Sequence, residues 1–207
     1  SRQVLAEGRR FHGNKAAVNV GVSTFIPKPH TPFQWEPMGD MAGIRAKLGY
    51  LIAEFKRPGL KLRWNDPDES VFEGMLTRGD RRMAAVVERA WRKGAKFDAW
   101  QDHFRRDAWA EAMAEEGLDA AFFTHRPRRI DEVFPWEHID VAVTRRFLTG
   151  DYLMSQRQET RIDCRHHCFA CGILPKLKDL RRETPPEAWE CPPVTRVADR
   201  RPALIQL

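Results

Sequence analysis

The sequence predicts a mixed α/β to mainly α protein, on the evidence of two periodic patterns and one cluster of cysteines. Residues 16–66 show strand-like and helix-like spacing in the order strand, helix, strand, which is typical of an α/β unit. From residue 67 to about residue 160 the apolar spacing is helical. Near the C-terminal end, cysteines fall at positions 164, 168 and 171. We therefore expect a small α/β part, a helical domain and a cysteine-rich loop.

Composition limits the class of protein. The 207 residues suffice for one domain or a domain with an appendage, and 42% apolar residues allow a core. No stretch approaches the roughly 18 apolar residues that a membrane helix needs, so we expect no membrane partner. The chain begins without Met and without the apolar segment of a signal peptide, and we expect a cytoplasmic fragment of a longer protein. Clustered cysteines in such a chain favour a metal site over disulfides.

The chain is basic, with a formal net charge of +6. Short groups such as Arg81-Arg82 and Arg181-Arg182 are dispersed, and no polybasic block occurs. This pattern is compatible with nucleic acid, with an anionic cofactor or with a merely solvated surface. Nucleic acid is therefore kept as an alternative partner.

The first third of the chain is expected to hold two strands and one helix. We predict a strand over residues 16–26, a proline turn over 27–32, a helix over 40–56 and a strand over 60–64. The first strand alternates, with Val18, Val20, Val22 and Thr24 on one face. Three prolines end it, because proline lacks the N–H that a sheet requires. The helix repeats its apolar side chains at helical spacing, from Met41 to Phe55.

Residues 67–160 are expected to form a helical domain. Helices are predicted to start near Asp68 and to run from Asp80 to Gly94, from Asp98 to Glu116 and from Thr144 to Gln158. Arg78-Gly79-Asp80 is interpreted as the junction of the first two. Their apolar stripes predict burial of Val86, Val87, Trp91, Trp100 and Phe104. Residues 176–207, with two Pro-Pro pairs, are expected to be a linker or disordered tail.

The cysteines are the strongest chemical signal, and residues 161–175 are predicted to form a metal-binding loop. Cys164, Cys168 and Cys171 are separated by three and then two residues, a spacing at which thiolates converge on one metal. Zinc and iron–sulfur clusters both accept such ligands. The fourth ligand is left open, and the candidates are Cys191, His166 and His167.

The proline turn carries candidate binding residues. It directly follows a strand, which is where α/β barrels place their binding loops. Lys28, His30 and Thr31 are the candidates for the rim of a substrate or cofactor site, His30 for a substrate and the other two for an anion. The alternative is a rigid turn without a binding role. The sequence contains no Gly-rich phosphate loop and no nucleophile elbow, so the catalytic residues stay unassigned.

Several longer stretches resemble one known family. Residues 22–35, VSTFIPKPHTPFQW, are similar to the sixth-strand region of radical SAM barrels, whose methylthiotransferase-type members have a comparable proline turn. Residues 78–82, 94–100, 135–140 and 163–172 resemble the C-terminal half of an uncharacterised radical SAM family with an N-terminal cobalamin (B12)-binding domain. The resemblance covers about residues 16–174. One departure is Asn65, where the family commonly has His, so Asn65 is given no ligand role.

The resemblance implies a fold and a set of cofactors. Residues 1–66 would be the last part of a partial (β/α) radical SAM barrel, followed by the helical C-terminal domain. The B12-binding domain and the motif that holds the SAM-binding [4Fe–4S] cluster would lie upstream, as partners within the parent chain. The late cysteines would then be a second group, not the one that activates SAM. Ala170 stands where a SAM loop usually has an aromatic residue, and Phe169 is one position early.

Two classes of function follow. The first is the C-terminal region of a radical SAM enzyme of unknown substrate, with an iron–sulfur cluster at the late cysteines and cobalamin in the parent. The parent would cleave S-adenosyl-L-methionine to a 5′-deoxyadenosyl radical, and this chain alone would be inactive without the SAM-binding motif. The alternative is a free-standing basic zinc-binding module that recognises nucleic acid. A third reading is that the cysteines only lock the fold of an interaction domain.

Overall fold

The computed structural model describes residues 1–185, 191 and 203–204. The fold is mixed α/β, with helix predominating and a small parallel sheet near the N-terminus. It divides into two compact units. Unit 1 comprises Ser1–Pro27 and Pro37–Pro127, and unit 2 comprises Lys28–Glu36 and Arg128–Leu207. The predicted domains followed one another along the chain, whereas here the proline turn is grouped with the C-terminal part.

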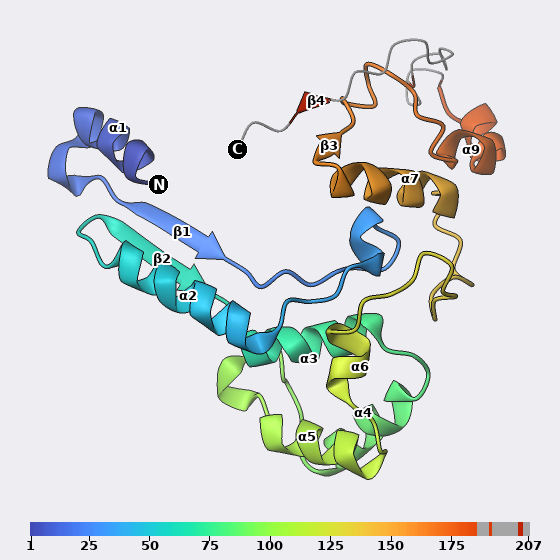
Figure 1. The fold of residues 1–207 in the computed structure, drawn as a ribbon, viewed down its shortest axis with the longest axis horizontal. Coiled ribbons are helices and arrows are strands. Elements are labelled where there is room, and N and C mark those ends of the chain that lie inside the picture. Colours follow the sequence, from blue (N-terminus) through green and yellow to red (C-terminus); the bar gives the residue numbers. More distant parts are fainter. Residues whose placement is uncertain (186–190, 192–202, 205–207) are drawn as a thin grey trace. The chain divides into compact units, whose positions relative to one another are not determined.

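Unit 1 begins with a strand–helix–strand arrangement. After α1 (Arg2–His12) and the single turn η1 (Gly13–Lys15), β1 (Val18–Val22) pairs in parallel with β2 (Leu60–Trp64), and α2 (Met41–Phe55) connects them (Figure 1). The predicted α/β unit is therefore confirmed. Burial alternates along residues 16–26 as predicted. The strand itself is shorter, because its pairing with β2 covers only five residues.

The rest of unit 1 is helical. It contains α3 (Pro67–Arg78), α4 (Met83–Arg92), the single turn η3 (Gln101–His103), α5 (Arg106–Glu115) and α6 (Ala120–Thr124). Among them, α4 packs against α5 and α3 packs against α6 (Figure 1). The cap of α3 is Asp66 rather than the predicted Asp68. The Asp66 carboxylate accepts a hydrogen bond of 2.7 Å from the backbone N–H of Asp68, and Pro67 takes the first helical position.

The core of unit 1 corrects part of the predicted burial. It consists of Met75, Met83, Val86, Ala90, Ala95, Ala108, Trp109, Ala112, Met113 and Phe123. Val86 is buried as predicted and Phe104 packs against the core half-buried. The predicted burial of Val87, Trp91 and Trp100 is wrong, since these side chains are 43%, 57% and 62% exposed.

The reason for the error around Trp100 is local. The predicted helix over residues 98–116 begins only at Arg106. Phe97, directly before the predicted start, has a positive φ of 59°, outside the range of a right-handed helix. The Asp98 carboxylate then accepts a hydrogen bond of 3.2 Å from the backbone N–H of Arg105, which closes the intervening residues into a loop. Trp100 lies on this loop and not on a helix face.

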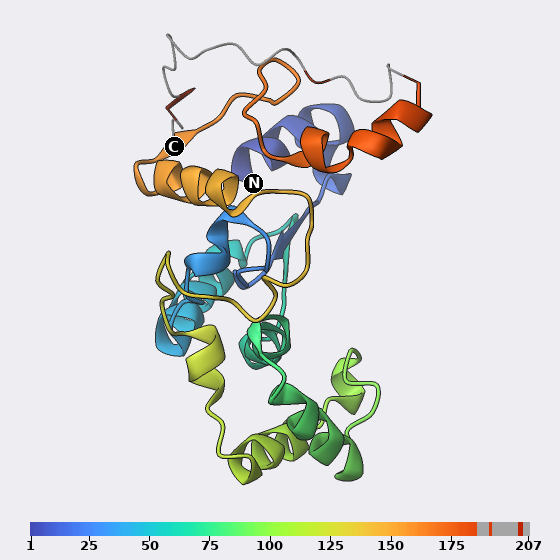
Figure 2. The same ribbon diagram turned by 90° about the vertical axis from the view of Figure 1, so that its right-hand side faces the viewer.

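Unit 2 contains short elements around a small aromatic core. They are η2 (Pro32–Trp35), α7 (Arg145–Gln156), β3 (Glu159–Thr160), α8 (Ile173–Lys176), α9 (Lys178–Glu183) and β4 (Ala203–Leu204), which pairs antiparallel with β3. The core is made of Trp35, Phe134, Trp136 and Leu148. Thr144 caps α7, close to the predicted helix start. In Figure 2 the orange loop that carries three cysteines is an irregular segment between α7 and α8.

The C-terminal tail is described at residues 176–185, 191 and 203–204. Helix α9 lies inside the segment predicted to be a linker or disordered, and that part of the prediction is wrong. Residues 186–190, 192–202 and 205–207 lie outside the described residues.

Within the described part of the chain, no helix combines the length and the apolar character that crossing a membrane requires.

Candidate metal centre and adjoining pocket

The cysteine loop has a folded backbone. The Asp163 carboxylate accepts a hydrogen bond of 2.8 Å from the N–H of Arg165, and the carbonyl of Asp163 accepts one of 3.0 Å from the N–H of His166. These bonds turn the chain at Cys164. Ala170 and Gly172, on either side of Cys171, both have positive φ, at 53° and 115°. The loop therefore reverses direction around two of its three cysteines, as convergence of the thiols would require.

Three contacts hold this loop against α7 and the segment before it. The backbone N–H of Thr144 donates a hydrogen bond of 2.8 Å to the carbonyl of Cys171. A Cβ atom at Gly172 would lie 2.7 Å from the carbonyl oxygen of Ala142, so only glycine fits there. The guanidinium of Arg161 lies 4.8 Å from the ring centroid of Phe169 and forms an ion pair with Asp151 on α7. Phe169, whose position is unusual for a SAM loop, thus anchors the loop.

The four thiols differ in exposure. Cys168 is buried, Cys171 is half-buried, and Cys164 and Cys191 are exposed; none forms a disulfide. Partial burial raises the pKa of Cys191, and the charges of the Cys168, Cys171 and Cys164 thiolates raise it further. Cys191 is the candidate fourth ligand beside these three thiols.

In the part of the chain that the structure describes, the candidate ligands do not converge on one point. Among the described residues, no three side chains of His, Cys, Asp or Glu are close enough together to hold a metal. His166 is exposed, and the ring of His167 packs edge-on against Phe169 with centroids 4.7 Å apart. Three soft thiols in a turned loop, together with Cys191, are a donor set that fits zinc or an iron–sulfur cluster once the thiols draw together on binding.

The three predicted rim residues have different positions. The Thr31 hydroxyl donates a hydrogen bond of 2.7 Å to the carbonyl of Lys28, which closes the proline turn. Lys28 is exposed, and neither residue lines a cavity near the cysteine loop. His30 has a positive φ of 56° and does line one. Of the three, only His30 is placed where a ligand could reach it from this cavity.

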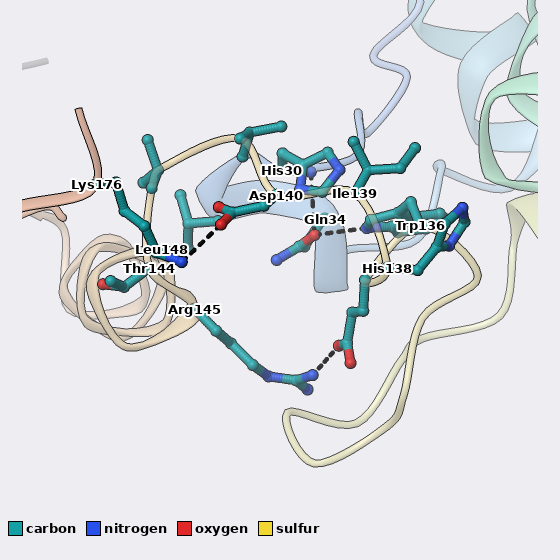
Figure 3. A pocket seen from close by; sticks show the side chains of 13 residues that line it. His30, Gln34, Trp136, His138, Ile139, Asp140, Thr144, Arg145, Leu148 and Lys176 are labelled. Carbon is teal, nitrogen blue, oxygen red and sulfur yellow. Dashed lines mark hydrogen bonds and ion pairs between the residues drawn. The ribbon is translucent and has the colours of Figure 1, made fainter. Parts of the chain in front are cut away.

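That cavity, hereafter the unit 2 pocket, has a volume of about 460 Å³. Its walls come from the proline turn, residues 136–145, Leu148 of α7 and Lys176 of α8 (Figure 3). The Oε1 atom of Gln34 accepts two hydrogen bonds, from the backbone N–H of His30 (3.1 Å) and from the indole N–H of Trp136 (2.9 Å). Gln34 is only 4% exposed, so these bonds fix the orientation of its side chain.

Two ion pairs flank the pocket. Lys176 lies 2.6 Å from the carboxylate of Asp140, which also accepts a hydrogen bond of 2.9 Å from the N–H of Ala142. The Lys176 ammonium, followed by this backbone hydrogen bond, lowers the pKa of Asp140. On the other side Arg145 pairs with Glu137 and donates to the carbonyl of Glu132 at 2.8 Å. Both carboxylates of the pocket wall are thus neutralised by a neighbouring cation.

Gln34 and Trp136 were not singled out from the sequence as site residues. Both lie in stretches that carried the family resemblance, residues 22–35 and 135–140. Long matched stretches were therefore a usable signal. Neither stretch by itself predicts that Gln34 and Trp136, about one hundred positions apart, form a hydrogen bond.

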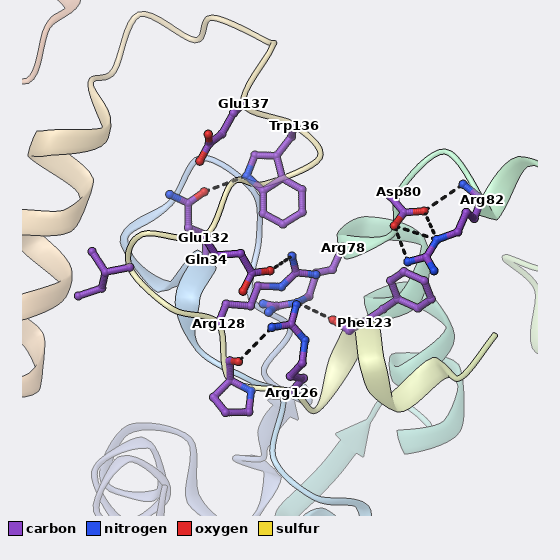
Figure 4. Close-up of polar contacts among 12 residues, drawn as sticks. Gln34, Arg78, Asp80, Arg82, Phe123, Arg126, Arg128, Glu132, Trp136 and Glu137 are labelled. Atoms are coloured by element: carbon purple, nitrogen blue, oxygen red, sulfur yellow. Dashed lines mark hydrogen bonds and ion pairs between the residues drawn. The ribbon is translucent and has the colours of Figure 1, made fainter.

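Another stretch of the resemblance, residues 78–82, has a structural role within unit 1. Arg78 is fully buried and its Nε donates a hydrogen bond of 3.0 Å to the carbonyl of Phe123 (Figure 4). A Cβ atom at Gly79 would lie 2.4 Å from Cγ of Met83. The Asp80 carboxylate accepts a hydrogen bond of 3.0 Å from the N–H of Arg82 and pairs with its guanidinium. The predicted helix junction is confirmed, and close packing is what requires the glycine.

The fold and the site define a mixed α/β protein with a three-cysteine loop beside a polar pocket. Comparison of the chain with family models, with curated proteins and with solved structures found no match.

Proposed function

We propose that this chain is the metal-binding C-terminal region of a radical SAM enzyme and that Cys164, Cys168, Cys171 and Cys191 hold one iron–sulfur cluster. The observation that carries the proposal is a loop with three cysteines at metal-ligand spacing, whose backbone turns at both Cys164 and Cys171. Four cysteine thiolates are the usual ligand set of a [4Fe–4S] cluster.

Two features of unit 1 support the family part of this proposal. Parallel strands joined by a helix are the repeating unit of a (β/α) barrel, and β1 and β2 form one such unit. The proline turn that resembles the radical SAM sixth-strand region leaves the carboxyl end of β1, where barrels build their sites. The B12-binding domain and the SAM-binding motif would lie upstream in the parent, whose substrate stays unassigned.

The cluster is proposed to be structural or electron-relaying. A bound cluster would supply one-electron redox chemistry. The protein would supply four thiolates and hold the loop through Thr144 and Arg161. Because free thiols persist in a reducing compartment, we place the protein in the cytoplasm as part of the same proposal.

A basic zinc-binding module that recognises nucleic acid is the competing proposal. It is favoured by the net charge of +6 and by the fit of four cysteines to tetrahedral zinc. The bound metal separates the two. Anaerobic purification followed by iron, sulfide and zinc analysis should give a brown protein with iron and sulfide. A colourless protein with one zinc per chain would support the competing module instead.

Substitution identifies the ligands. Cys168→Ala should lose most of the metal, because Cys168 is the buried thiol of the set. Cys191→Ser should lower the metal content and His166→Ala should not, if Cys191 is the fourth ligand. Unchanged metal in Cys168→Ala would remove the site. SAM binding by this chain that disappears in Cys168→Ala would instead make these the radical-generating cysteines.

A further inference from the structure

Two polar groups on the wall of the unit 2 pocket have no hydrogen-bond partner among the described residues. The amide nitrogen of Gln34 has no hydrogen-bond partner among the described residues, although the side chain is 4% exposed. In Figure 3 this nitrogen points away from His30 and Trp136, toward the side where Leu148 and Arg145 lie. The Nε2 atom of His30 is also buried and unpaired among the described residues. Buried polar atoms normally have partners, and a bound anionic group would accept a hydrogen bond from the unpaired Gln34 amide and from Nε2 of His30 when that nitrogen carries the proton.

The backbone around His30 is held in an unfavourable conformation that serves this geometry. A positive φ costs a non-glycine residue free energy, and such residues concentrate at binding sites. The hydrogen bond from the N–H of His30 to Gln34 fixes both residues together. The two unpaired groups are therefore preorganised on one wall of the pocket.

The opposite wall begins with the first turn of α7. Thr144, Arg145 and Leu148 line the pocket, and the first turn contains no acidic residue. The N–H groups of Arg145 and Arg146 have no acceptor within the helix, and the positive end of the helix dipole lies there. Asp140 and Glu137 are the two carboxylates among the described residues that line the pocket, and each is paired with a cation.

We propose that the unit 2 pocket binds a small molecule with an apolar body and one carboxylate or phosphate group. The amide of Gln34, the imidazole of His30 and the first turn of α7 receive the anionic group. Ile139, Val141 and Leu148 contact the apolar body. A volume of about 460 Å³ suits a small ligand. The proposal does not rest on the metal, although the pocket wall at Thr144 is hydrogen-bonded to Cys171.

The test uses the complete 207-residue chain and three probes of similar shape. Phenylacetate carries a carboxylate, phenyl phosphate carries a phosphate, and phenethyl alcohol is neutral. The readout is the NMR signal of the Trp136 indole N–H, assigned with Trp136→Phe. At least one anionic probe should shift this signal saturably and phenethyl alcohol should not. A response to phenylacetate alone identifies a carboxylate ligand, and a response to phenyl phosphate alone a phosphate ligand.

Gln34→Glu is the decisive variant. Its carboxylate still accepts both hydrogen bonds but replaces the donating amide with an acceptor, so the Kd for the anionic probe should rise at least tenfold. Gln3→Glu, the same charge change at an exposed site in unit 1, should leave the Kd unchanged. If Gln34→Glu fails to fold, His30→Asn takes its place, because Asn tolerates a positive φ. Equal binding of the neutral probe, no shift with either anion, or an unchanged Kd in the folded variant would overturn the proposal.

Discussion

At the scale of single residues, two tryptophans nine positions apart should behave in opposite ways. Trp109 is 8% exposed and packs 4.4 Å from the ring of Phe72, whereas Trp100 is 62% exposed. Trp109→Ala should lower the free energy of unfolding by about 3–5 kcal/mol. Trp100→Ala should change it by less than about 0.5 kcal/mol. Urea denaturation of both variants measures this, and equal losses would contradict the assigned burial.

Tyr152 gives unit 2 a dependence on alkaline pH. Burial, followed by the hydrogen bond of 3.0 Å to the Glu36 carboxylate, raises the pKa of Tyr152. Because the phenol loses its proton less readily in the folded protein, this contact stabilises the fold fully below the unfolded pKa of about 10. The contribution is lost as pH rises through the folded value.

Tyr152 can be titrated by itself once Tyr50, the other tyrosine of the chain, is replaced. In a Tyr50→Phe background, the ultraviolet phenolate signal reports Tyr152 alone. The pH midpoint of this signal should be higher in the folded protein than in the chain unfolded in about 8 M urea. A midpoint that is equal or lower in the folded protein would show that the contact with Glu36 is absent in solution.

At the scale of elements, the cysteine loop depends on one arginine. Arg161 lies over the rings of Phe147 on α7 and Phe169 in the loop, at 5.4 and 4.8 Å, and pairs with Asp151. Such cation–π contacts contribute about 0.5–2 kcal/mol each. Arg161→Ala should therefore speed amide hydrogen exchange in residues 168–172 at least fivefold. Arg165→Ala, at an exposed arginine in the same loop, is the matched control and should have less effect on these amides.

Some elements were predictable because their signals are local. The strand–helix–strand order followed from alternation and from a proline turn, and the starts of α3 and α7 were predicted to within about two residues from polar residues before apolar runs. The helix expected over residues 98–116 failed because Phe97 adopts a left-handed conformation and Asp98 bonds the chain back at Arg105. Neither feature is visible in apolar spacing, which continues across the loop.

At the scale of the whole molecule, the two compact units should respond differently to loss of metal. Every proposed ligand lies in unit 2. A chelator should therefore increase hydrogen exchange in the cysteine loop and α7, because ligands preorganised by a metal lose order without it. Exchange in α4 and α5 of unit 1 should stay within error. Equal loosening of both units would contradict a metal site confined to unit 2.

The candidate site was predictable in its cysteines but not in its surroundings. Spacing alone indicates Cys164, Cys168 and Cys171 as candidate ligands, because residues of one short loop can converge on a metal, and their role stays a prediction. The unit 2 pocket could not be predicted in the same way. It joins Gln34 to Trp136, and only the fold brings the proline turn to the C-terminal segment. His30 was found because its loop was unusual, whereas Lys28 and Thr31 proved to shape the turn.

The central claim is that the cysteines ligate one metal centre, and X-ray absorption at the edge of the bound metal tests it most directly. The spectrum of the purified chain should show sulfur neighbours at about 2.3 Å, with four sulfurs per metal in the wild type and fewer in any residual metal of Cys191→Ser. If the bound metal is iron, an iron–iron distance in the same spectrum would establish a cluster. If the bound metal is zinc, a spectrum at the zinc edge with sulfur neighbours and no metal–metal distance would support the zinc module. A shell of only nitrogen and oxygen neighbours would contradict the claim.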